Sequence, residues 1–308
     1  MTATASLARV SSTRQGVWYA VGAYGLWGVL PVYWKALQTV PAPEILTHRI
    51  AWSFVFLAIL TATRGQWAPL RAALSRRNLL IYCVAAALLS VNWLLYIWAV
   101  NAGRIVETSL GYFINPLLSV LLGVAFLRER LRRAQWLAVS LAAGGVAYLT
   151  WQYGSLPWVA LALATSFGLY GLMKKTAPLP ALQGLTLETA LLWLPALAFL
   201  AFGEIRGTAA LGHAGGRTDL LLVGTGIVTG LPLLLFAAAA RKVSLVTLGL
   251  LQYLAPSLQL AIGVLVYGEP FGRTRLIGFG VIWGALALYS LEGLWRARRR
   301  QPVTLRLG

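Results

Sequence analysis

The sequence predicts an all-α integral membrane protein with ten transmembrane helices, built as two related halves of five helices each. Only 11% of its 308 residues are charged and 59% are hydrophobic, whereas a soluble domain carries roughly 25% charged residues. Apolar runs of about 20 residues, the length that spans a bilayer core as a helix, recur along the chain. Long unbroken runs also argue against a β-barrel, whose strands give short segments of alternating polarity.

Ten apolar runs define the expected spans, and the remaining sequence is short. Residues 1–15 form a basic tail before an uncleaved first span, residues 16–151 and 152–295 form the two halves, and residues 296–308 form a basic C-terminal tail. The longest gap, 203–218, is rich in glycine and too short for a soluble domain. The expected spans are 17–37, 44–63, 78–100, 107–127, 133–151, 156–173, 184–202, 219–240, 244–267 and 274–295.

Basic residues predict the orientation of these spans. Alternate gaps place 19 of the 26 Lys and Arg residues on the side of the two termini and seven on the other side. By the positive-inside rule, both termini are cytoplasmic, which requires an even number of spans. We therefore expect a multi-pass protein of the bacterial inner membrane, surrounded by lipid. We expect no nucleic-acid partner, because phosphate binding would need a hydrophilic basic face.

An internal repeat relates the two halves. Shifting the chain by 140 residues without a gap aligns Pro, Gly, Glu and Arg residues as well as apolar ones. An odd number of spans in each copy means that the second copy enters the membrane upside down, as in many secondary transporters. The matches include Trp18 on Trp158, Gly28 on Gly168, Lys35 on Lys175, Pro116 on Pro256, Gly123 on Gly263, Glu129 on Glu269, Arg133 on Arg273 and Gly144 on Gly284.

A stripe of polar residues follows one face of the fourth span. Thr108, Tyr112, Asn115 and Ser119 are spaced at i, i+4, i+7 and i+11, which is the spacing of one helical face. Pro116 follows the middle of this stripe and is expected to bend the helix.

A second polar stripe in the ninth span corresponds to the first. The shift of 140 residues carries Tyr112 to Gln252 and Ser119 to Gln259, and Pro256 again follows the middle position. The two stripes are either symmetry-related borders of a central substrate path or surfaces that hydrogen-bond between packed helices. The recurrence of polarity across the repeat favours the path.

The start of the second span contains two groups that can exchange protons. Glu44 and His48 are four residues apart on one face, and such a pair is able to titrate near neutral pH. The alternative is a helix-start motif, with an acid in the first turn and Arg49 anchored at the membrane interface. The repeat places His48 on Glu188 of the seventh span, the most deeply placed acid and the best single candidate for a coupling-ion site.

Further candidates for the substrate path lie in the first and third spans. Asn92 and Tyr96 share a face of the third span, and Asn92 is the expected cavity residue, whereas Asn101 and Glu107 are candidates for capping helix ends. Trp27 lies well inside the first span and either packs against other helices or stacks on a planar or cationic substrate.

Signals of an enzyme are missing from the sequence. It has no phosphate-binding P-loop, and its two histidines, His48 and His213, do not have the spacing of metal ligands. The single cysteine, Cys83, excludes an internal disulfide. We therefore expect no enzymatic activity, no cofactor and no metal.

Five stretches of the chain resemble the EamA family of the drug/metabolite transporter superfamily. These are GAYGLWGVLPVYWKAL (22–37), EILTHRIAWS (44–53), NWLLYIWAVN (92–101), ETSLGYFINPLLSVLLG (107–123) and LQYLAPSLQL (251–260). The resemblance implies two inverted EamA repeats, cytoplasmic termini and a permease or exporter role. It also implies a cavity formed by spans 1, 3, 4, 6, 8 and 9, which adds Thr229 and Pro232, and it argues against Glu188 lining the path.

The expected function is therefore secondary transport of small organic solutes or drugs by alternating access. A small-molecule substrate is the expected partner, and a second copy of the chain is a candidate one. Two alternatives stay open from sequence: a membrane enzyme acting on a lipid-linked substrate, and a non-transporting membrane protein that assembles another complex.

Overall fold

The computed structural model is mainly helical in the residues that it describes, which are 2–101, 105–154, 157–268 and 272–299. These ranges contain no strand. The helices are α1 (Thr2–Ala36), α2 (Ala42–Thr63), α3 (Trp67–Ala72), α4 (Arg76–Asn101), α5 (Ile105–Leu127), α6 (Arg133–Tyr153), α7 (Trp158–Thr176), α8 (Ala181–Ile205), α9 (Gly216–Ala240), α10 (Leu245–Gln252), α11 (Leu254–Leu265) and α12 (Arg273–Arg299).

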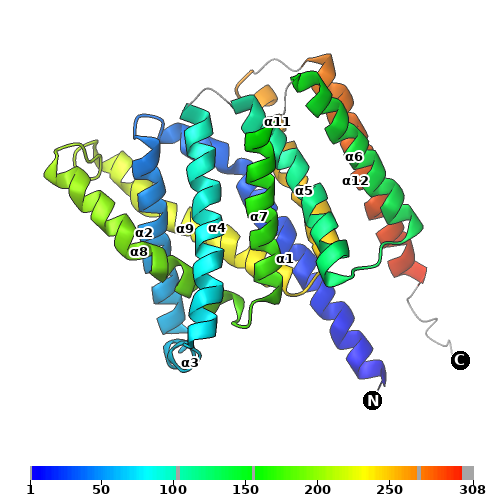
Figure 1. Ribbon diagram of the computed structural model, residues 1–308, viewed down its shortest axis with the longest axis horizontal. Helices are drawn as coiled ribbons and strands as arrows, with labels where there is room; N and C mark the ends of the chain where they lie inside the picture. The colour runs from blue at the N-terminus through cyan, green and yellow to red at the C-terminus, as the bar shows by residue number, and fades with distance from the viewer. Residues whose placement is uncertain (1, 102–104, 155–156, 269–271, 300–308) are drawn as a thin grey trace, which may run out of the picture.

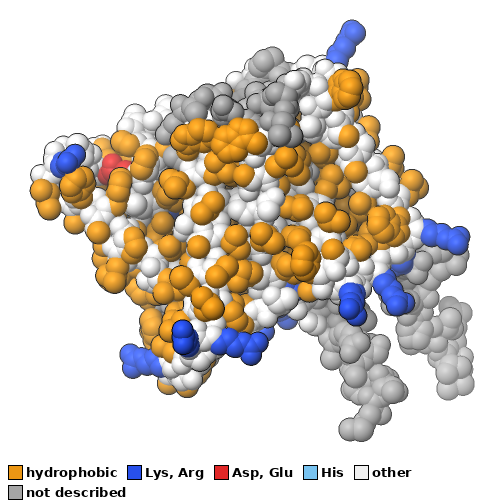
Figure 2. Space-filling view, in the orientation of Figure 1, with side chains coloured by type: hydrophobic (Ala, Val, Ile, Leu, Met, Phe, Trp, Pro, Cys, Tyr) orange, Lys and Arg blue, Asp and Glu red, His pale blue; other side chains and the backbone are white. Residues whose placement is uncertain are grey.

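The long helices form a bundle whose outer surface is apolar. Five described segments are long and apolar enough to cross a membrane: Ala42–Thr63, Arg76–Tyr96, Ala181–Ile205, Gly216–Ala240 and Leu245–Leu265. Figure 2 shows hydrophobic side chains across the face of the bundle, with several Lys and Arg side chains at its lower end. Apolar side chains on a surface of this extent suit contact with lipid. The chain is a multi-pass membrane protein.

The first helix begins at the same end of the bundle at which the last helix ends. Figure 1 shows the start of α1 and the end of α12 at the lower end of the molecule. This placement agrees with an even number of crossings. Each expected span coincides with a helix or, for 244–267, with a pair of helices. The number of helices that cross the membrane and their orientation in it stay predictions.

The ninth expected span is divided into two helices. α10 ends at Gln252 and α11 begins at Leu254, with Tyr253 between them. Pro256 has no N–H, so the carbonyl group of Gln252 cannot receive the usual helical hydrogen bond. Pro116 and Pro232, by contrast, lie inside the continuous helices α5 and α9. The sequence did not predict this difference.

The helix pairs surround a common centre. α1 packs against α9 and α11, α5 packs against α7 and α10, and α4 packs against α7. α2 lies against α8 and α9, whereas α6 and α12 pair with each other at one edge of the bundle (Figure 1). Glycine permits the tightest of these contacts: a Cβ atom at Gly249 of α10 would lie 2.6 Å from the carbonyl oxygen of Pro116 in α5. These contacts bring the two polar stripes together.

Candidate functional site

A cavity of about 650 Å³ lies at the centre of the bundle. This volume is within the range of sites that hold a small organic molecule, roughly 300–1,000 Å³. Most of its lining is contributed by α1, α4, α5, α7, α9, α10 and α11, and one residue comes from α2. The helices expected from the family resemblance are therefore those that enclose the cavity, with α2 in addition.

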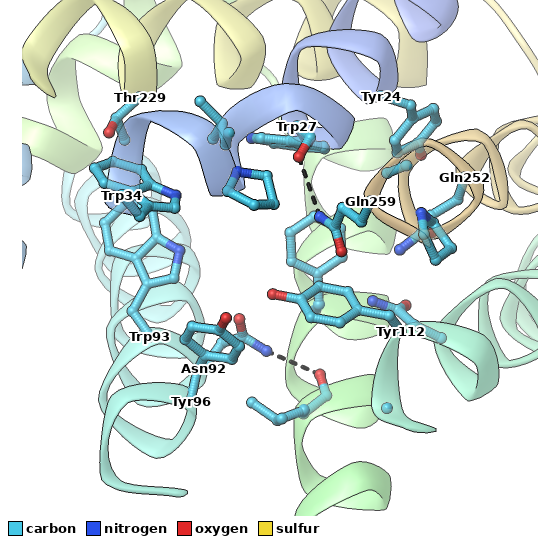
Figure 3. A pocket seen from close by; sticks show the side chains of 18 of the residues that line it. Tyr24, Trp27, Trp34, Asn92, Trp93, Tyr96, Tyr112, Thr229, Gln252 and Gln259 are labelled. Carbon is cyan, nitrogen blue, oxygen red and sulfur yellow. Dashed lines mark hydrogen bonds between the residues drawn. The ribbon is translucent and has the colours of Figure 1, made fainter. Parts of the chain in front are cut away.

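All eight residues expected along the substrate path lie around this cavity. Figure 3 shows Trp34 and Trp93 below Thr229 on one side, and Tyr112, Gln252 and Gln259 on the other. Pro256 also lines the cavity, whereas Pro116 and Pro232 are not part of its lining. The eight lining residues are Trp27, Asn92, Tyr96, Tyr112, Asn115, Thr229, Gln252 and Gln259. Contact between these residues and a substrate stays a prediction.

Two amides of the lining also connect helices. Asn92 of α4 donates through Nδ2 to the carbonyl oxygen of Leu163 and to Oγ of Ser166, both at 2.9 Å and both in α7. Gln259 of α11 donates to the carbonyl oxygen of Trp27 in α1 at 3.1 Å. The cavity interpretation and the packing interpretation of the polar stripes are therefore compatible, because one side chain serves both roles.

Aromatic rings form much of the cavity wall. Trp27 contacts Tyr24, Phe167 and Phe236, with ring centroids 5.6–5.8 Å away. Tyr96 and Tyr112 meet edge to face at 6.0 Å. These distances are those of favourable aromatic pairs. Trp27 thus packs within a cluster and also presents part of its surface to the cavity.

Arg49 reaches the cavity from α2 and is one of its lining residues, whereas one of the two sequence interpretations of this segment anchors it at the membrane interface. Its guanidinium carbon lies 4.8 Å from the ring centroid of Trp34 and 4.6 Å from that of Trp93. Its Nε donates to Oγ1 of Thr229 at 3.1 Å. Arg49 lies two helical turns after the start of α2, so its depth within the span is the signal that sequence reasoning missed.

Glu44 and His48 lie together beside the cavity but do not line it. Nε2 of His48 is 3.8 Å from Oε1 of Glu44. The same carboxylate oxygen accepts a hydrogen bond from the backbone N–H of Ala210 at 2.6 Å. This contact ties α2 to the loop between α8 and α9, so Glu44 has a structural role. Proton coupling by Glu44 and His48 stays a prediction.

Glu188 is buried in an ion pair away from the cavity. Its Oε1 is 2.8 Å from Nζ of Lys174, and its Oε2 accepts from the hydroxyl group of Tyr170 at 3.1 Å. The side chains of Glu188 and Lys174 are 1% and 3% exposed. Glu188 is not among the residues that line the cavity, so a coupling ion at this position would act apart from the substrate path.

The side chains of three further polar residues lie outside the described set. They are Asn101, Glu107 and Thr108. Ser119, the last member of the first stripe, is buried and faces Gly249 of α10. The first stripe thus contributes Tyr112 and Asn115 to the cavity and Ser119 to helix packing.

The cavity is closed toward the end of the bundle where α1 begins and α12 ends. Glu129 accepts hydrogen bonds from the backbone N–H groups of Leu245 and Val246 at 2.7 and 2.9 Å. These N–H groups form the start of α10, where a carboxylate is favourable. Lys175 lies 3.9 Å from Glu129 and donates to the carbonyl oxygen of Ala240 at 3.3 Å. These contacts join the loop that follows α5 to α7 and α10, and join α7 to α9.

Comparison with known proteins identifies the family. Residues 14–151 match the model of the EamA-like transporter family. The uncharacterized transporter YojE of Bacillus subtilis is 48% identical over 92% of this chain and 95% of its own. Protein RarD of Escherichia coli is 45% identical over 93% of this chain and 97% of its own. This chain belongs to the EamA-like transporter family. Five stretches of the sequence resemble RarD proteins of the EamA family. The comparisons confirm this resemblance.

Other relatives of this EamA-like transporter extend the comparison. The chloramphenicol-sensitive protein RarD of Pseudomonas aeruginosa is 32% identical over 94% of this chain and 98% of its own. The crystal structure of a protein that is 21% identical superposes with a TM-score of 0.67 over 92% of this chain and 98% of the other. At this identity the superposition shows a shared fold and nothing more. The family and its relatives make the chain a membrane transporter.

Nothing in the described part of this EamA-like transporter suggests a metal centre. No group of three or more His, Cys, Asp or Glu residues in those ranges could hold a metal ion. The relatives from Bacillus subtilis and Vibrio cholerae are named as uncharacterized transporters. The polar groups among the described lining residues are amides, phenols, indoles, the hydroxyl group of Thr229, the ammonium group of Lys35 and the guanidinium group of Arg49.

Proposed function

We propose that this membrane transporter is a secondary transporter, which moves small organic solutes by alternating access to its central cavity. The observation that carries the proposal is a cavity of about 650 Å³ that reaches one end of the bundle. Its lining runs along α1 from the buried Tyr24 to the exposed Lys35 and Gln38. Lys35 is eleven positions after Tyr24 in α1, which corresponds to about 17 Å along the helix axis.

The opposite end is closed by contacts that can separate. Glu129 binds the start of α10 through two backbone N–H groups, and Lys175 joins the same region from α7. These are polar contacts between helices and involve no covalent link. Exposure of the cavity at this end requires Glu129 to leave α10 while the other end closes. Such a change would transfer a bound solute across the membrane.

Equivalent helix contacts in the two halves of the chain support this motion. The packing of α1 against α11 corresponds to the packing of α7 against α5. The packing of α1 against α9 likewise corresponds to that of α7 against α4. Two halves with equivalent contacts provide two conformations of similar energy, in which the open and closed ends change places. A bacterial inner membrane, with both termini on the cytoplasmic side, is the proposed setting.

The test is solute flux in proteoliposomes that contain the purified chain. Radiolabelled amino acids, nucleosides, aromatic carboxylates and their amides form the solute panel. Asn115→Leu combined with Gln252→Leu should lower flux at least about tenfold, because two amides would be lost from the cavity wall. Arg64→Gln, an exposed position at the far end of α2, is the control. Flux that survives the double substitution would remove this site assignment.

Cysteine labelling separates a transport cavity from a packed interface. With Cys83 replaced by serine, single cysteines at positions 112 and 259 should react with a water-soluble maleimide, because both positions line the cavity. A cysteine at Leu194, which is exposed on the outer apolar surface, should react poorly in lipid. Absence of labelling at both cavity positions would support a non-transporting membrane protein instead.

A further inference from the structure

Arg49 gives the cavity a fixed positive charge that none of the described lining residues neutralises. An arginine side chain stays protonated in proteins. The described residues around the cavity include Arg49 and Lys35 but no Asp or Glu. Among the side chains that the structure describes, no carboxylate forms an ion pair with Arg49. A charge held in a partly dry cavity without a counter-ion is costly.

The described neighbours of Arg49 orient its side chain and leave its two Nη groups without a hydrogen bond among the described residues. Thr229 holds Nε from α9, and the rings of Trp34 and Trp93 lie against the guanidinium group from α1 and α4. The hydrogen bonds among the described residues therefore engage Nε and not the two Nη groups. The ring contacts partly compensate for the charge, but they supply no hydrogen-bond acceptor. Two parallel N–H groups on a guanidinium match the two oxygens of a carboxylate.

The rest of the cavity suits an apolar body attached to that anion. Trp27, Phe167 and Tyr112 supply aromatic surface, and Figure 3 shows Tyr112 on the side opposite Trp34 and Trp93. Lys35 lies toward the open end of the cavity, where its Nζ is 3.6 Å from the ring centroid of Tyr267. Two cations in a cavity that reaches the surface raise the local concentration of anions.

We propose that the cavity binds organic anions, specifically small carboxylates with an aromatic or apolar body, and that Arg49 is the residue that binds the carboxylate. This inference rests on the proposed function and names the substrate class of that site. Two N–H groups of Arg49 would replace the water molecules that hydrate the carboxylate group of the solute. The aromatic wall would bury the remainder of the molecule.

The test measures binding to the purified full-length chain with matched pairs of probes. The probes are 3-phenylpropanoate and 4-phenylbutanoate, each compared with its primary amide, which has the same shape and no charge. Trp27, Trp34 and Trp93 line the cavity, and these probes do not absorb at the tryptophan excitation wavelength, so intrinsic fluorescence reports binding. The unmodified chain should bind each acid at least about tenfold more tightly than its amide.

Variants assign this preference to Arg49. Arg49→Gln should remove the difference in affinity between acid and amide, and the ratio of the two affinities is the quantity compared. Arg49→Lys should keep part of the preference, because it keeps the charge but loses the bidentate geometry. Arg64→Gln removes a charge from the other end of α2 and should bind like the unmodified chain.

Specific results would overturn the inference. Equal binding of acid and amide by the unmodified chain, absence of binding by both acids, or an unchanged acid preference in Arg49→Gln would each do so. The comparison within the unmodified chain needs no variant, so a variant that fails to fold leaves the test intact. Transport of solutes by an unmodified chain that binds acid and amide equally would refute the anion site and leave the transport function standing. Arg49-dependent carboxylate binding without flux of any solute would support the site and refute the transport function.

Discussion

The buried ion pair between Lys174 and Glu188 allows a quantitative prediction about stability. Its atoms are 2.8 Å apart, and the two side chains are 3% and 1% exposed, so water cannot screen either charge. Removing one partner of such a pair leaves the other buried and uncompensated, which costs about 3–5 kcal/mol. We expect Lys174→Met and Glu188→Gln each to destabilise the fold by this amount.

The double variant distinguishes an ion pair from two independent contributions. Lys174→Met combined with Glu188→Gln leaves no uncompensated charge, so its cost should fall below the sum of the single variants by about 3 kcal/mol. Reversible unfolding in mixed detergent micelles, followed by circular dichroism, measures each free energy. The control cycle uses Lys175 and Glu129, which are 3.9 Å apart and 22% and 14% exposed; its coupling should be no more than about 1 kcal/mol.

Additive costs for Lys174 and Glu188 would refute this reasoning. Agreement within about 0.5 kcal/mol is the behaviour of sites that do not interact. The same variants examine the expectation that Glu188 is a coupling-ion site. If Glu188 acts only through its ion pair, the double variant should transport solute with an unchanged dependence on the proton gradient. Loss of that dependence in a stable double variant would instead support coupling at Glu188.

Three further predictions concern packing, closure and protonation. Gly249→Val should destabilise the fold by about 1–3 kcal/mol in the same unfolding assay, because its side chain would meet the carbonyl oxygen of Pro116; unchanged stability would contradict this contact. Glu129→Gln should increase labelling of a cysteine at position 252 from the end of the bundle where α1 begins, since it weakens the contact with α10; equal labelling would argue against closure there. His48→Gln should flatten the pH dependence of transport between about pH 5 and 8, whereas an unchanged profile would favour the helix-start interpretation of this segment.

The positions of the helices were predictable because hydrophobic runs are a local property of the chain. A bilayer requires about 20 apolar residues for each crossing, and no distant contact is needed to recognise such a run. The inward-facing residues Tyr112, Asn115, Gln252 and Gln259 were predictable for a related reason. Polar groups in hydrocarbon must find partners or water, so a polar face at helical spacing points toward the centre of a bundle.

The composition and periodicity of the sequence, together with the family resemblance, thus indicated a helical membrane protein and eight residues of the cavity wall. The tertiary structure decided the position of Arg49, the partner of Glu188 and the interruption at Tyr253. Arg49 meets Thr229 from 180 residues further along the chain, and Glu188 meets Lys174 across two helices. Such contacts depend on how each helix is rotated against its neighbours, and side-chain packing between distant segments fixes that rotation. For this reason the charge of the cavity became evident only in three dimensions.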